Sequence, residues 1–136
     1  MVDLWVIYAF AGFLAYFFVN FFFKFISSEN PIVASMIVYG AAAIVMLVLA
    51  LQKMDFSINA KSALIAALAG FASVTGTIFA LKSMQLAPNP GYSTAIFSAN
   101  FVLLTIVSIF FFGSELTLIK GLGLLATLIG LVLLSI

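Results

Sequence analysis

The residues that could do chemistry in this sequence lie mostly in one apolar stretch, YSTAIFSANFVLLTIVSIF, at positions 92–110. Its hydroxyl and amide side chains are Ser93, Thr94, Ser98, Asn100, Thr105 and Ser108. Hydroxyl and amide groups exchange hydrogen bonds readily, but a hydroxyl attacks a substrate only when a base activates it. We therefore expect these side chains to hydrogen-bond a polar solute or a neighbouring helix rather than to catalyse a reaction.

Catalytic and metal-binding groups are scarce. The 136 residues contain no His, no Cys and four acidic residues. The acids are Asp3, Glu29, Asp55 and Glu115, all in loops or at the edges of apolar runs. We therefore expect no enzyme activity, no metal site and no cofactor. No Asp or Glu lies inside an apolar run, so the sequence offers no obvious carboxylate for proton exchange within the membrane.

Composition indicates the broad class of the protein. The chain is 66% hydrophobic and 7% charged, with a mean hydropathy of +1.38, whereas soluble domains are about 45–50% apolar and 25% charged. Its formal net charge is +1, so it has no basic tract of the kind that binds nucleic acid. We expect a multi-pass integral protein of the cell membrane, either an inner or a plasma membrane.

Apolar runs separated by short polar breaks predict the fold class. A helix of about 20 apolar residues, rising 1.5 Å per residue, crosses roughly 30 Å of hydrocarbon. The breaks SSENP, QKMDFSINAK, QLAPNP and GSEL contain the residues that end helices. The sequence therefore predicts an all-α membrane protein, with residues 1–136 forming a single five-helix domain. The expected spans are 4–26, 32–51, 62–84, 91–112 and 117–136.

Lysines in short loops set the orientation of membrane proteins, because the side richer in Lys and Arg stays in the cytoplasm. Five crossings would divide the lysines of this chain three to two: Lys53, Lys61 and Lys120 against Lys24 and Lys82. This bias is weak. We therefore expect the chain to insert both ways up, which gives copies of opposite orientation.

Helical spacing sorts the polar positions of the fourth run. At 100° per residue, Thr94, Ser98, Thr105 and Ser108 form a stripe within about 80°. Ser93 and Asn100 share a second face, and Asn100 lies near the expected bilayer midplane. Polar groups at that depth often line a water-filled path. The same groups can also bond to carbonyls of their own helix. On the first interpretation, the cavity-lining candidates are Asn20, Ser73, Thr77, Ser98, Asn100 and Thr105.

Small residues on the fifth run suggest close contact with another helix, because they let two backbones approach. They recur on one face, at Gly123, Ala126, Thr127 and Gly130. We expect this face to serve helix packing or oligomer formation.

The second half of the chain carries a series of short motifs: Ala80-Leu81-Lys82, Ala87-Pro88, Gly113, Leu116-Thr117, and Gly123 with Gly130. In this order they resemble the second half of an EamA-type domain of the drug/metabolite transporter superfamily. The family's Glu follows its Gly directly, whereas here Ser114 precedes Glu115, so no family role is carried to Glu115. The first run, with Gly12, Asn20 and Lys24, fits the family more loosely.

The resemblance implies a function. Typical members of that family have two inverted five-helix halves and carry small metabolites or drugs, and this chain is similar to one half. The implied protein is a transporter that works by alternating access as an antiparallel homodimer, with a second copy, the lipid bilayer and a small solute as its partners. Two alternatives stay open. The chain could pair with a paralogous five-helix subunit in a heterodimeric transporter or flippase, or it could be a scaffold or regulatory subunit that does not transport.

Overall fold

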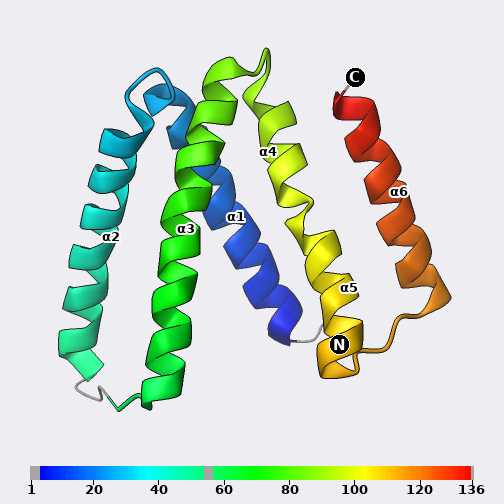
Figure 1. Cartoon of the computed structure of the whole chain (residues 1–136), viewed down its shortest axis with the longest axis horizontal. Helices are drawn as coiled ribbons and strands as arrows, with labels where there is room; N and C mark the ends of the chain where they lie inside the picture. Colours follow the sequence, from blue (N-terminus) through cyan, green and yellow to red (C-terminus); the bar gives the residue numbers. More distant parts are fainter. Residues whose placement is uncertain (1–3, 54–56, 136) are drawn as a thin grey trace. The chain divides into compact units, whose positions relative to one another are not determined.

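The computed structural model of the chain describes residues 4–53 and 57–135. Within these ranges every regular element is an α-helix (Figure 1), which confirms the all-α class. The helices are α1 (Leu4–Ile26), α2 (Pro31–Lys53), α3 (Ala60–Leu86), α4 (Pro90–Ser98), α5 (Asn100–Phe112) and α6 (Leu118–Ser135).

Asparagines fix where three of the helices begin. The side-chain oxygens of Asn30, Asn59 and Asn89 accept hydrogen bonds from backbone N–H groups in the first turns of α2, α3 and α4, at 2.8–2.9 Å. The first amides of a helix have no partner within the helix, so these caps supply one. Pro31 and Pro90 come next in two of the three cases, where the missing N–H of proline costs nothing.

In the part of the chain that the structure describes, four helical segments are long and apolar enough to cross a membrane: Val6–Ile26, Pro31–Gln52, Ala60–Leu86 and Pro90–Phe112. The chain is therefore a multi-pass membrane protein by length and composition, and these segments match the first four predicted spans closely. The apolar part of α6, Leu118–Leu134, is shorter. It begins one residue after the predicted fifth span, whose last residue, Ile136, lies outside the described residues. The fifth crossing stays a prediction.

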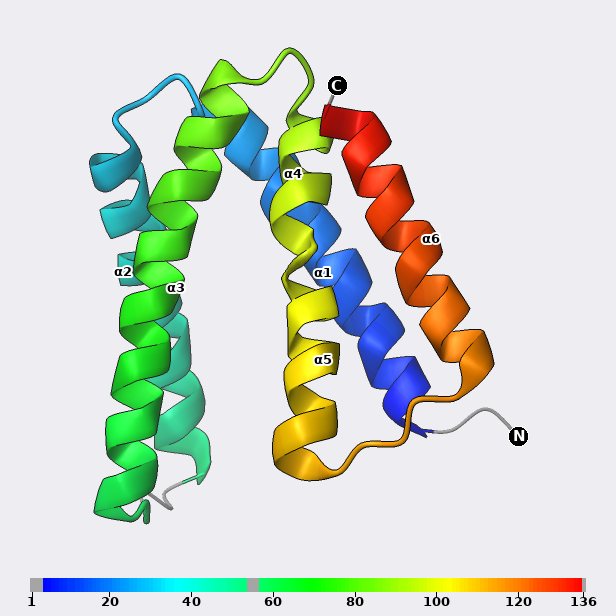
Figure 2. The same cartoon turned by 45° about the vertical axis from the view of Figure 1, so that its right-hand side comes forward.

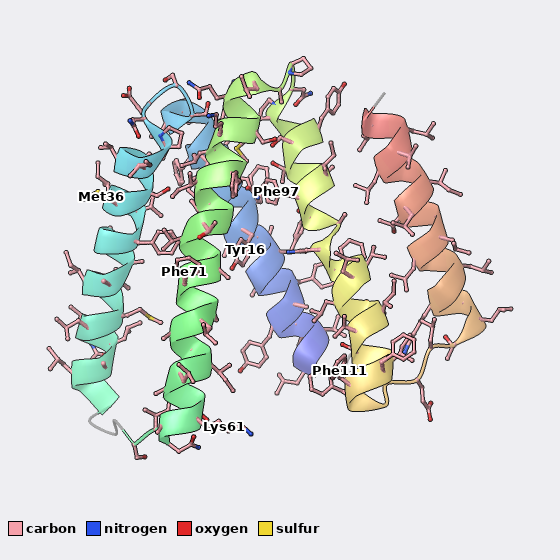
Figure 3. All side chains as sticks on the ribbon, viewed as in Figure 1. Tyr16, Met36, Lys61, Phe71, Phe97 and Phe111 are labelled. Carbon is pink, nitrogen blue, oxygen red and sulfur yellow. The ribbon has the colours of Figure 1, made fainter. Side chains whose placement is uncertain are left out.

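The first unit of the chain, residues 1–85, contains α1, α2 and α3. Its buried cluster joins all three helices through Phe23 of α1, Ala34 of α2, and Leu81 and Met84 of α3, where the α1–α2 turn meets the end of α3. Large apolar side chains elsewhere are mostly exposed, including Met36 and Phe71 (Figure 3). Such exposure suits helices that are surrounded by lipid.

The second unit, residues 86–136, contains α4, α5 and α6. Figure 2 shows α5 continuing from α4 after an interruption, and α6 returning alongside. Gly113 ends α5 with φ of +62°, a left-handed conformation that glycine adopts without steric cost. From that turn α6 runs back and packs against α4.

Candidate functional site

The fourth span is broken at Ala99. The Ala99 amide donates to the Ile96 carbonyl at an N···O distance of 3.1 Å, and the Val102 amide donates to the Ala99 carbonyl at 2.9 Å. Both bonds join residues three apart, whereas an α-helix joins residues four apart. Ala99 has φ of −59° and ψ of −11°, shifted from the α-helical ψ of about −42° toward that of a 3₁₀ turn.

The break changes the hydrogen bonding of the backbone in the middle of the span. In an unbroken helix, the amides of Ala99 and Val102 would bond to the carbonyls of Ala95 and Ser98. Here each amide bonds to the next carbonyl along the chain. The carbonyls of Ala95 and Ser98 therefore lose their regular helical donors, and they can accept a hydrogen bond from elsewhere.

Local sequence accounts for the break. Ser98 and Asn100 flank Ala99, and their side chains compete with the backbone for hydrogen bonds, which weakens a helix. On either side, Thr94 donates its hydroxyl to the Pro90 carbonyl and Thr105 donates to the Phe101 carbonyl, each at 2.9 Å. This bonding to the preceding turn bends helices.

Polar residues flank the break at the centre of the span. Ala99 and Asn100 are the tenth and eleventh residues of the 23-residue segment Pro90–Phe112. Ser98 and Asn100 are both exposed. A carboxamide, a hydroxyl and two carbonyls without their helical donors thus lie within six consecutive residues, 95–100. Such a group of donors and acceptors can hydrogen-bond a small polar solute.

A groove of about 650 Å³ lies between α5 and α6. Thr105 and Ser108 of the predicted stripe line it, together with Thr127 of α6. The hydroxyls of Thr105 and Thr127 each donate to the carbonyl four residues earlier in their own helix, at 2.9 Å. Glu115 and Lys120 also line the groove, near the α5–α6 turn. Thr105 therefore shares its surroundings with two charged groups and with the hydroxyls of Ser108, Ser114 and Thr127.

Three of the cavity candidates lie in the first unit. Asn20 is half-buried and donates its amide to the Tyr16 carbonyl of its own helix, at 3.0 Å. Ser73 is exposed on α3. Thr77 is half-buried, and its hydroxyl is 2.8 Å from the Tyr39 hydroxyl of α2. Of these three, Thr77 makes a hydrogen bond to a neighbouring helix.

The bond between Tyr39 and Thr77 gives a direct test of the α2–α3 interface. In a double-mutant cycle of Tyr39→Phe and Thr77→Val, we expect a coupling free energy of about 0.6 kcal/mol, because hydrogen bonds between membrane helices average that value. Unfolding of the four proteins in mixed micelles measures it. Additive effects of the two substitutions would show that the two hydroxyls do not stabilise each other.

The four small residues of α6 that we expect to serve helix packing differ in their exposure. Gly123 and Ala126 are exposed, whereas Thr127 and Gly130 are half-buried. A Cβ added at Gly123 or Gly130 would meet no heavy atom within 4 Å. The second unit by itself thus leaves space at these two glycines.

Sequence reasoning missed several of these features. The fourth run was predicted to be one continuous helix. The signal for its break was Ser98-Ala99-Asn100, because Ser and Asn side chains compete with the backbone for hydrogen bonds. Sequence reasoning also missed Tyr39 and Ser35, one turn apart on α2, which line a cavity of about 220 Å³ with Val74 of α3. The Ser35 hydroxyl is buried and has no hydrogen-bond partner among residues 4–53 and 57–135. Their spacing of four residues was the signal that could have found them.

A comparison of the chain with models of protein families, with curated proteins and with solved structures gave no match.

Proposed function

We propose that the protein transports small solutes as a pair of antiparallel copies that alternate between two openings. The observation that carries this proposal is the break at Ala99, with Asn100 beside it at mid-span. Transporters commonly bind their substrates near the bilayer midplane at interrupted helices, where backbone groups are free of the helical ladder. The interrupted span supports a binding site between Ser98 and Asn100.

The even distribution of lysines supports the antiparallel arrangement. Two copies of opposite orientation reproduce the inverted repeats from which many transporters are built. Rocking of one copy against the other would then open the site to each side of the membrane in turn. A solute held at the midplane needs no carboxylate in the span for this motion.

Release of solutes from vesicles tests the transport function. Purified protein is reconstituted into vesicles loaded with amino acids, nucleosides and cationic dyes, and mass spectrometry follows the release of each. We expect at least one class to leave faster than from vesicles without protein. If every class is retained equally by both kinds of vesicle, the scaffold alternative replaces transport.

Reporters at the C-terminus test the orientation. Because five crossings divide the lysines three to two, we expect reporters for the two sides of the membrane to be active in the same cells. Adding two lysines between Lys53 and Lys61 should move the population to one orientation, with that loop in the cytoplasm. Signal from one side alone, in the unmodified protein, would favour a heterodimer with a paralogous subunit.

A further inference from the structure

The groove between α5 and α6 combines apolar walls with charges near one end. Phe101, Leu104 and Leu124 supply apolar surface along it. Glu115 of the α5–α6 turn and Lys120 of the first turn of α6 supply one negative and one positive charge. Both charged side chains are exposed. The groove therefore has the polarity of an amphiphile, with a charged end and an apolar body.

Measured from the α5–α6 turn, whose Ser114, Glu115 and Leu116 line one end, the groove reaches about as far as one leaflet of a bilayer. Its lining on α5 begins at Phe101, 11 residues before the end of that helix at Phe112, or about 16 Å along the axis. Its lining on α6 extends to Thr127, nine residues after Leu118, or about 14 Å. Half of the roughly 30 Å hydrocarbon core is about 15 Å. A free solute with two charges would use only the end near the turn.

The two threonine hydroxyls inside the groove do not require a polar ligand, and its two serines, Ser108 and Ser114, lie nearer the α5–α6 turn. Thr105 and Thr127 have already given their hydrogen atoms to carbonyls of their own helices. Their methyl groups remain for contact with a hydrocarbon chain. The ligand's polar part therefore belongs at Glu115 and Lys120, and its apolar part belongs toward the membrane centre.

We propose that this groove binds a zwitterionic phospholipid with a primary ammonium headgroup, of the phosphatidylethanolamine class. The Lys120 ammonium pairs with the lipid phosphate, and the Glu115 carboxylate accepts hydrogen bonds from the lipid ammonium. Phosphatidylcholine has the same phosphate, but its quaternary ammonium has no N–H to donate to Glu115. An anionic lipid without an ammonium meets Glu115 as a like charge. This groove lies along α5, beyond the break at Ala99, and lipid binding there does not depend on the proposed transport.

Native mass spectrometry of the purified full chain tests the proposal. The detergent-solubilised protein is titrated with phosphatidylethanolamine, phosphatidylcholine and phosphatidylglycerol of identical acyl chains. We expect phosphatidylethanolamine to be retained most strongly. Lys120→Gln should lower its retention about fivefold, the factor that one lysine at a lipid surface contributes. Glu115→Gln should remove the preference over phosphatidylcholine while leaving retention of phosphatidylglycerol equal or higher.

Lys61→Gln is the matched control. Lys61 lies in the first turn of α3 (Figure 3), as Lys120 does in α6, and five crossings would place both on the same side of the membrane. Its loss should leave lipid retention unchanged. Gly123→Leu should reduce retention of all three lipids, because Gly123 lines the groove. An added Cβ there meets no atom within 4 Å, so the leucine side chain has room to occupy the groove in place of lipid.

Four results would overturn the proposal. The first is equal retention of phosphatidylethanolamine and phosphatidylcholine by the unmodified protein. The second is an equal loss from Lys61→Gln and Lys120→Gln. The third is competition by free phosphoethanolamine as effective as that of the whole lipid, which would assign the groove to a soluble zwitterion. The fourth is a change of oligomeric mass in Gly123→Leu without loss of lipid, which would assign the groove to a second copy.

Discussion

Replacing Asn100 with leucine is expected to abolish most solute flux while leaving the protein folded. The side chain lies beside the break, near the middle of the fourth span. Its contribution to folding should be small, because hydrogen bonds between membrane helices average only about 0.6 kcal/mol. Its contribution to recognition should be larger, because a solute deprived of its partner at this depth keeps an unsatisfied polar group. Flux from loaded vesicles measures the effect, and size-exclusion chromatography checks the fold.

Companion variants separate recognition from folding. Ser98→Ala should also impair flux, and Thr105→Val should have an intermediate effect. Thr75→Val is the control, because the Thr75 hydroxyl donates to the Phe71 carbonyl of its own helix, just as the Thr105 hydroxyl donates to Phe101. Flux should be normal in that protein. If Asn100→Leu protein is largely unfolded and its folded fraction is fully active, Asn100 joins helices and does not bind the solute.

Leu81→Ala should destabilise the first unit by about 2 kcal/mol. Leu81 is 1% exposed and belongs to the cluster that joins α1, α2 and α3. Leucine-to-alanine changes in soluble cores cost about 2–5 kcal/mol, as a transfer term plus a cavity term. In a membrane the transfer term nearly vanishes, because lipid tails are as apolar as leucine. The cavity term remains, so the low end of that range is expected.

Unfolding in mixed micelles measures this loss, with Leu68→Ala as the matched control. Leu68 lies on the same helix but is 61% exposed. Its truncation removes contact with lipid or detergent and should change the free energy of unfolding little. Equal effects at the two positions would mean that the cluster at the α1–α2 turn does not hold the helices together.

The sequence was sufficient to locate the helices, because their ends are determined locally. Asparagine caps, prolines and charges lie at the breaks, and each acts within one turn of its own position. The predicted spans 4–26 and 91–112 accordingly agree with α1 and with the combined α4 and α5 at nearly every residue. Apolar composition alone was sufficient to identify a membrane protein.

Side-chain environments were harder to predict, because they depend on neighbouring helices. Thr77 could be identified as a polar residue, but its partner Tyr39 is 38 residues away in sequence. The stripe on the fourth run assumed 100° per residue throughout, whereas a 3₁₀ turn advances about 120° per residue. The positions after Ala99 are therefore rotated relative to those before it. Thr105 also shares a groove with Lys120 of α6 and Glu115 of the turn, which no single-helix pattern indicates.

The helices differ in length in a way that bears on bilayer thickness. The 27 residues of α3 extend over about 40 Å, whereas the 18 residues of α6 extend over about 27 Å. A hydrocarbon layer of about 30 Å accommodates the longer helix by tilt and the shorter one by local thinning. If α6 also crosses the membrane, the bilayer next to it should thus be thinner than that around α3. Thickness mismatch costs fractions of a kcal/mol per Å, so a bilayer of one uniform thickness should leave one of these two helices mismatched.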